Sequence, residues 1–439
     1  MRKIFQYILM AVAVVATASC SNELDEALQP VGNGTLQFVV SDFPAFGEGP
    51  ETRVIGTQDE GKTAWANGDQ ILVHMYSQKY GDQAVTLIYN ADTWKPDGDI
   101  TLSYLENEIP TITAVYAPGC KISENNIVLN DNQVYGMSEY IHATTKIEGN
   151  TLRISFEDAT RNYSRLRIVG VPNQTLTVTT TGFTPAGASA AADGTTYTVT
   201  TNGDGNAFLY GVFSEGATVS VNHGDVVLKD YTFTAEKNPN GTEHNKSYAL
   251  DARPIIDGTF GGKATATEDD IKALVEQIKT YVDNGITTIT VTGSNPAIID
   301  MGTYTNTAIG EAIYRLVGSY THDADNPYNG TIDLILPDVT EIVDYEFHSA
   351  YALNSITLPK VTTVGNDAFY NCGYLQELTF GSVVTLIKSE QAFKAVGQYV
   401  DGGYCDLVLN RGQKSAATEY QPDDNRKWWN TFWKSITLI

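Results

Sequence analysis

Basic residues are scarce in this sequence. Its 439 residues include 28 Lys and Arg against 52 Asp and Glu, and the formal net charge at pH 7 is −24. Because phosphate binding depends on clustered basic side chains, this balance argues against a nucleic-acid partner and against electrostatic docking on anionic lipid. Charged residues make up only 18% of the chain and hydrophobic residues 42%, which excludes a largely disordered protein.

Residues that carry metal or nucleophilic chemistry are also sparse. The sequence has 4 Cys and 6 His at wide spacing, and it contains no HExxH, GxSxG or P-loop motif. We therefore predict no catalytic residues, no metal site and no cofactor, and a protein that is not an enzyme. A surface glycan-processing enzyme is the alternative, because a pair of carboxylates across a cleft leaves no sequence motif.

The apolar run at the start of the chain is too short to span a membrane. It extends from Ile8 to Ala18 after a basic start, whereas a spanning helix needs roughly 20 apolar residues. This pattern is typical of a signal peptide. The run ends in Thr17-Ala18-Ser19-Cys20, which resembles the lipobox of bacterial lipoproteins. The resemblance implies removal of residues 1–19 and a lipid anchor on Cys20. An ordinary exported protein cut nearby is the alternative.

Acidic residues follow Cys20. Glu23, Asp25 and Glu26 lie in this stretch, and no Lys or Arg occurs between Lys3 and Arg53. Acidic residues at this place resemble the signal for outer-face display in Bacteroidetes lipoproteins. We expect residues 20–34 to be an acidic tether that holds the chain at the outer membrane, on the cell surface.

From residue 35 to about residue 250, short β-rich runs alternate with Gly, Asn, Asp and Pro turns, and no helical period is present. Such spacing predicts β-sandwiches. The length favours two in tandem, over residues 35–160 and 161–252, with a boundary near Asp158 to Ser164. The fold class predicted for the whole chain is mainly β.

Several motifs in this region carry a family resemblance. Glu51-Thr52-Arg53 is followed by Trp65-Ala66-Asn67-Gly68-Asp69-Gln70-Ile71-Leu72-Val73, then by Val115-Tyr116-Ala117-Pro118 and Ser247-Tyr248-Ala249-Leu250. In this order they resemble the fimbrillin-like proteins, which are pilins and pilus-associated lipoproteins of Bacteroidales. The resemblance covers roughly residues 30–252 and implies two transthyretin-like β-sandwiches.

The resemblance also gives Arg53 two interpretations. In pilin members a protease cuts after an Arg that follows the first strand, and loss of that strand leaves a groove that a strand of another subunit fills. Arg53 is then a maturation site and other pilus subunits are partners. The alternative is a loop arginine in a lipoprotein that keeps its first strand. For the Trp65 to Val73 stretch we expect a turn at Gly68-Asp69, with Trp65 packed against the sandwich and Ile71 and Val73 in the core.

Helical signals appear after residue 253. Thr267 and Asp270 form a capping box, and an apolar stripe on one face follows it. A second helix is expected around Ala308 to Val317. We predict that residues 253–330 lead into the last part of the chain, as helix and strand.

A repeat with a period of 22 residues follows. Leu334, Ile356 and Leu378 share one column, and others hold Phe347 with Phe369, Val339 with Val361 and Val383, and Ile342 with Val364 and Leu386. A fixed period of this kind predicts a short α/β solenoid over residues 331–410. The unit resembles the leucine-rich repeats of treponemal and Bacteroides surface proteins.

Three tryptophans lie near the C-terminus, in residues 411–439. Trp428, Trp429 and Trp433 have two interpretations: a cap on the last coil, or an exposed platform that binds a sugar or a partner.

Together these patterns predict a non-enzymatic cell-surface lipoprotein. It is a fimbrial tip or accessory subunit, or an adhesin, that binds through its repeat head. The alternative is a free-standing surface lipoprotein that binds a host protein or glycan and never polymerises.

Overall fold

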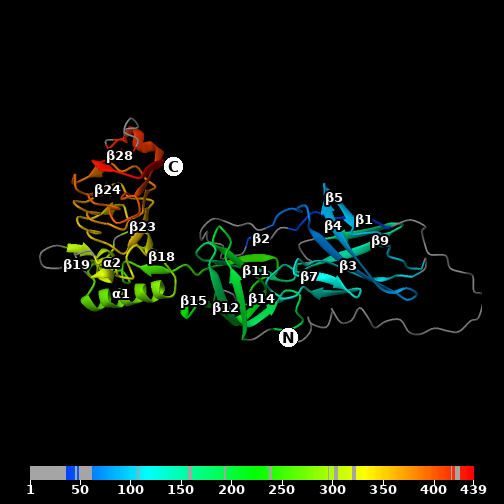
Figure 1. The fold of residues 1–439 in the computed structure, drawn as a ribbon. Helices are drawn as coiled ribbons and strands as arrows, with labels where there is room; N and C mark the ends of the chain where they lie inside the picture. The colour runs from blue at the N-terminus through cyan, green and yellow to red at the C-terminus, as the bar shows by residue number, and fades with distance from the viewer. Residues whose placement is uncertain are drawn as a thin grey trace, which may run out of the picture.

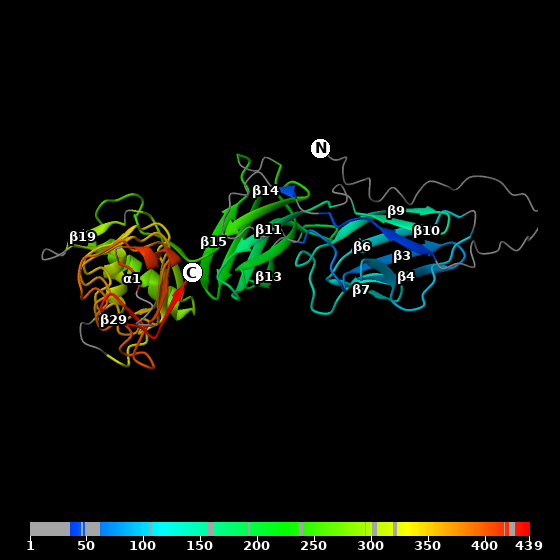
Figure 2. The same ribbon diagram turned by 90° about the horizontal axis from the view of Figure 1, so that it is seen from above.

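The computed structural model describes residues 36–44, 47–48, 62–105, 108–156, 161–191, 194–236, 240–294, 296–300, 305–318, 323–416, 418–420 and 426–439. They form two β-sheet bodies and a solenoid, arranged in a row in both views (Figures 1 and 2). The predicted mainly-β fold is confirmed. Among these residues no helix has the length and hydropathy to cross a membrane.

The first body contains a seven-stranded sheet in which only the pairing of β1 with β10 is parallel. Its core holds Ile71 and Val73, as predicted, and Gly68 has the positive φ of a turn residue. In spatial order the strands are β1 (Gln37–Val40), β10 (Thr151–Ser155), β9 (Ile141–Glu148), β6 (Thr111–Tyr116), β3 (Gln70–Ser77), β4 (Gly81–Asn90) and β5 (Thr93–Pro96), with a separate hairpin of β7 (Cys120–Ser123) and β8 (Asn126–Leu129).

The second body is built on another seven-stranded sheet. Aromatic stacking fills its core, where the ring centroids of Phe183 and Phe213 lie 4.4 Å apart and those of Phe213 and Phe233 4.7 Å apart. The strand order is β13 (Thr195–Thr200), β12 (Thr175–Pro185), β14 (Asn206–His223), β11 (Ser164–Val169), β16 (Lys246–Asp251) and β2 (Gly47–Glu48), and β15 (Val226–Thr232) pairs with β14. The transthyretin-like topology of the two bodies stays a prediction.

The third body begins with strand β17 (Ile255–Asp257), and the predicted helix follows it. In α1 (Glu268–Asp283) the side chain of Thr267 accepts a hydrogen bond from the Asp270 amide, and the Asp270 side chain closes the capping box. The apolar stripe of α1 lies in the solenoid core. The second helix, α2 (Ala308–Val317), also lies where the sequence predicted it. Val226 of β15 belongs to the same core, so the second body packs against the solenoid.

The coils of the solenoid stack through parallel strands. The predicted column is confirmed, because Leu334 pairs with Ile356 and Ile356 with Leu378. The main sheet has the order β17 (Ile255–Asp257), β18 (Thr288–Thr292), β21 (Ile332–Ile335), β23 (Leu353–Leu358), β25 (Glu377–Phe380), β27 (Asp406–Leu409) and β30 (Ser435–Leu438). The shorter elements are β22 (Glu341–Ile342), β24 (Thr363–Val364) and β26 (Leu386–Ile387) in a three-stranded sheet, the hairpins β19 (Ile298–Asp300) with β20 (Thr305–Thr307) and β28 (Lys427–Trp428) with β29 (Thr431–Phe432), and the 3-10 helix η2 (Arg411–Ser415).

Two column assignments in the third coil were wrong. Val383 and Leu386 were predicted inside, but Val384 is the buried valine and Leu386 is 49% exposed. Val364 pairs with Ile387, so this coil has one residue more between its two strands than the preceding coil. The phenylalanine column stays stacked in spite of an insertion before Phe393. The ring centroids of Phe347 and Phe369 lie 5.6 Å apart, and those of Phe369 and Phe393 lie 5.7 Å apart.

One carboxyl group is buried among these coils. Glu346 is 2% exposed and stands 22 residues before Ala368, in a column that is otherwise small and apolar. It accepts hydrogen bonds from the Thr307 hydroxyl at 2.7 Å and from the Val343 amide at 2.9 Å. Since Thr307 caps α2, Glu346 ties that helix to the first repeat. Burial raises the pKa of Glu346 from its ordinary value of 4.5 to about 7.

This raised pKa gives a test of the packing. The folded solenoid holds the Glu346 proton more tightly than the unfolded chain, so its stability falls as the pH rises from about 4.5 to about 7 and stays low above that. We expect Glu346→Gln to remove about 3 kcal/mol of this pH dependence. Urea denaturation of both proteins between pH 4 and 8 measures it. Parallel stability curves for the two would contradict the assignment.

Candidate functional site

The N-terminal segment, residues 36–48, adds a strand to the edge of two different sheets. Its first part, β1, pairs in parallel with β10 at the edge of the first sheet, with Phe38 opposite Leu152. Its last part, β2, pairs in parallel with β16 at the edge of the second sheet. Because edge strands are held from one side only, the segment resembles a bound peptide more than an internal strand of either sheet.

The residues that connect β1 to β2 are held by the first body. Phe43 is 6% exposed, and its ring lies edge-on at 4.9 Å from Trp65 and 5.5 Å from Tyr116. The Ser41 carbonyl accepts a hydrogen bond from Trp65 Nε1 at 2.8 Å, and the Ser41 hydroxyl accepts one from the Phe156 amide at 2.7 Å. Trp65 therefore packs against the core, as the sequence predicted, and also holds the segment.

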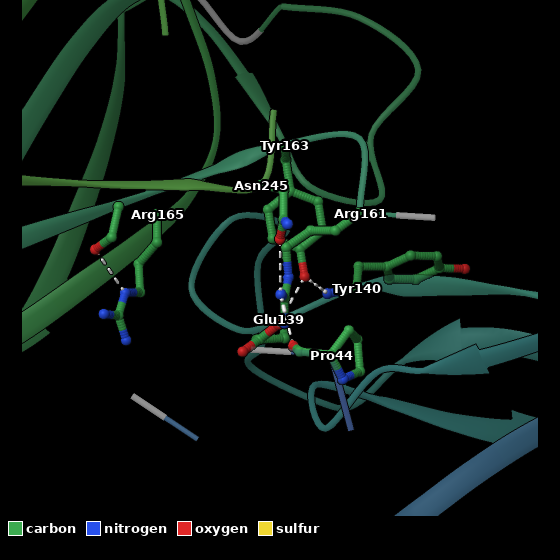
Figure 3. A network of polar contacts seen from close by, with 8 residues as sticks. Pro44, Glu139, Tyr140, Arg161, Tyr163, Arg165 and Asn245 are labelled. Atoms are coloured by element: carbon green, nitrogen blue, oxygen red, sulfur yellow. Dashed lines mark hydrogen bonds and ion pairs between the residues drawn. The ribbon is translucent and has the colours of Figure 1, made fainter. Parts of the chain in front are cut away.

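A buried arginine joins the segment to both bodies (Figure 3). The Arg161 side chain has no exposed surface and forms an ion pair with Glu139 at 2.8 Å. Its Nη1 donates to the Asn245 side-chain oxygen at 3.0 Å and to the Pro44 carbonyl at 2.7 Å. Tyr163 donates its hydroxyl proton to Glu139 at 2.9 Å. One guanidinium group thus has acceptors from the N-terminal segment, the first body and the second body.

The electrostatics of this cluster follow from its burial. A buried ion pair needs further hydrogen bonds to be favourable, and Asn245, Pro44 and Tyr163 provide three of them here. Burial, and then the charge of Glu139, raises the pKa of Tyr163 well above 10, so the phenol stays a neutral donor. The arrangement can bind and orient an extended chain, and its groups are all used in structural contacts.

Sequence reasoning missed this cluster. Arg161 and Glu139 carry no motif, and Arg161 lies in the stretch that was interpreted only as a boundary. The one signal in the sequence that could have pointed to the cluster is Arg161 itself, a basic residue in a β-rich region of an acidic chain.

The predicted site residues fall into two groups. Cys20 and Arg53 lie outside the described residues, so lipidation and cleavage stay predictions.

Trp428 and Trp433 are 3% and 1% exposed, and both ring centroids lie within 5.6 Å of that of Phe393, which ends the phenylalanine column. Trp429 is half-buried and donates to the Ser389 carbonyl at 2.9 Å. These three side chains do not form an exposed platform, because two of them cover the last coil.

Within the described ranges, no group of three or more His, Cys, Asp or Glu side chains is placed to hold a metal ion. Cys120, Cys372 and Cys405 are free and buried. Burial raises the pKa of Cys372 to about 12, and its thiol donates to the Phe347 carbonyl, so it is a packing residue.

Comparison with known proteins identifies the repeats. Residues 331–398 match the BspA type leucine rich repeat region in six copies. This part of the chain is a leucine-rich repeat. No curated protein matches the chain at a significant level.

Two solved structures show a weak similarity. A fimbrial protein from Bacteroides ovatus ATCC 8483 is 10% identical over 50% of this chain, with a TM-score of 0.25. This chain spans only 49% of the length of that protein. A protein provisionally assigned to cell adhesion, from Bacteroides fragilis NCTC 9343, is 11% identical over 49% of this chain and 92% of its own length, with a TM-score of 0.23.

The burial of the terminal aromatics predicts a difference between two neighbours. Trp433→Ala removes a buried ring and is expected to destabilise the leucine-rich repeats by about 3–5 kcal/mol. Phe432→Ala is the matched control, because Phe432 is 54% exposed. It is expected to change stability by less than about 0.5 kcal/mol. Thermal unfolding measures both, and equal losses would contradict a capping role for Trp433.

Proposed function

We propose that this chain is a non-enzymatic surface lipoprotein of the fimbrillin-like kind, anchored in the outer membrane through a lipid on Cys20. It acts as a fimbrial tip or accessory subunit, or as an adhesin, and its leucine-rich repeats form the binding head. The observation that carries the proposal is the N-terminal segment, an edge addition to two sheets that lies just before Arg53 in the sequence. The repeat match at the other end of the molecule supports a binding head.

Release of the segment is the step that this proposal requires. Cleavage after Arg53 would free residues 36–48 from the rest of the chain and leave the edges of β10 and β16 unpaired. The exposed site would present the unpaired backbone donors and acceptors of β10 and β16, which is what a strand from another subunit needs. The integrated protein would then hold its neighbour by main-chain hydrogen bonds.

The position of the leucine-rich repeats supports a tip or accessory role. Residues 435–438 form β30, which pairs with β27 at one edge of the solenoid sheet. A strand built into its own body in that way is not free to leave it and fill the groove of a neighbouring subunit. A shaft pilin needs both a free site and a free strand, so a position at the end of a filament fits better.

A second candidate is a free-standing lipoprotein that keeps its N-terminal segment. The burial of Phe43 and the hydrogen bond of Pro44 to Arg161 favour it, because they make the segment costly to remove. In this case the leucine-rich repeats bind a host protein or glycan without filament assembly.

Mass spectrometry of the mature N-terminus distinguishes the candidates. The protein is isolated from outer-membrane and sheared-filament fractions. The tip or accessory role predicts a lipidated Cys20 in the membrane form and a new terminus after Arg53 in the filament form. Cys20→Ser is the control and is expected to abolish lipidation and membrane retention. A lipidated Cys20 terminus in every fraction, with no filament association, would leave only the free-standing lipoprotein.

A further inference from the structure

We propose that the groove around Arg161 is a peptide-binding site that recognises an aromatic residue directly followed by a proline. Its ligand is an extended segment of another subunit that carries this pair, and in the intact chain Phe43-Pro44 occupies the site. The inference rests on the proposed function in one respect, since a partner can enter only after residues 36–48 leave.

The proline is recognised through its carbonyl group. Arg161 Nη1 donates to the Pro44 carbonyl at 2.7 Å, in a buried position. Proline has no amide proton and a fixed φ, and it keeps the residue before it extended. A segment with proline here therefore presents its carbonyl to the guanidinium in a preorganised backbone and buries no unpaired amide.

The aromatic residue is recognised by rings and by cations. The Phe43 ring contacts Trp65 and Tyr116 edge-on. The Arg161 guanidinium lies 5.7 Å from its centroid and the Lys62 ammonium 5.5 Å. Two cations near one ring favour an aromatic side chain over an aliphatic one of similar volume, because only the aromatic ring has a negative face.

Arg161 makes these two contacts depend on each other. Glu139 precedes β9 of the first body, whereas Arg161 precedes β11 of the second, and their ion pair spans the junction. Every extended peptide has a carbonyl at the Pro44 position, so the preference for proline comes from the amide proton that any other residue would add at this buried place. The site therefore selects for the aromatic–proline pair as a unit, beyond the sequence-independent pairing of strands.

The sequence restricts what can occupy the site. Phe43-Pro44 is the only aromatic–proline pair in the 439 residues. No other segment of this chain matches the signature, so the competing ligand comes from outside the chain.

Peptide exchange on the full-length chain tests the site. A specific protease site is placed in residues 55–60, outside the described residues, and the purified chain is cut there. A fluorescein-labelled peptide of residues 36–48 is added, and its binding is followed by anisotropy and by co-elution with the protein. We expect the labelled peptide to replace the resident segment.

Variant peptides show what is recognised, and they leave the fold of the protein untouched. Phe43→Ala in the peptide is expected to weaken binding at least about tenfold. Val39→Ala is the matched control, because Val39 lies on β1 and is 45% exposed, and it should bind like the parent peptide. On the protein, Arg161→Met should weaken the parent peptide by about tenfold or more and should reduce the discrimination against the Phe43→Ala peptide.

Three results would overturn the proposal. These are equal binding of the Phe43→Ala and parent peptides, unchanged binding to a folded Arg161→Met protein, and failure of any labelled peptide to enter the cut chain. The outcome is separate from that of the proposed function. A protein that binds the peptide but keeps its Cys20 terminus on cells would refute cleavage and retain the site.

Discussion

The ion pair of Arg161 with Glu139 is the interaction on which the arrangement of the first two bodies depends. It lies at their junction and is shielded from solvent, so it needs further hydrogen bonds to be favourable. Asn245 of the second body and Pro44 of the N-terminal segment supply further acceptors. The two sheets are therefore joined through the Arg161 guanidinium, which also contacts the N-terminal segment.

The leucine-rich repeats follow a different principle. Each coil buries its apolar column only against the next coil, as the stack of Phe347, Phe369 and Phe393 shows, so stability passes along the solenoid from neighbour to neighbour. Such a stack needs a cover at each end. The second body packs near one end through Val226, and Trp428 with Trp433 covers the other. The result is a rigid head at the far end of the molecule from the first sheet (Figure 1).

These two constructions suit display at a surface. In the proposed function, the first two bodies offer a site where one edge strand can be exchanged, which would be a means of attachment. The repeats offer a surface that does not depend on that exchange, because their main sheet contains only strands from β17 to β30 and none from the N-terminal segment. The proposal thus assigns attachment and recognition to opposite ends of one chain, and the excess of acidic residues disfavours docking on anionic surfaces.

Local and periodic features could be predicted from the sequence alone. The capping box at Thr267, the extent of α2 and the column of Leu334, Ile356 and Leu378 all follow from short-range chemistry or from a fixed period. The placement of Val384 instead of Val383 could not be predicted, because a one-residue insertion is invisible until the strands on either side are paired. The roles of Arg161 and Trp433 were decided by tertiary structure alone. Arg161 joins two bodies, and Trp433 covers the last coil, only because residues distant in sequence surround their side chains in the folded chain.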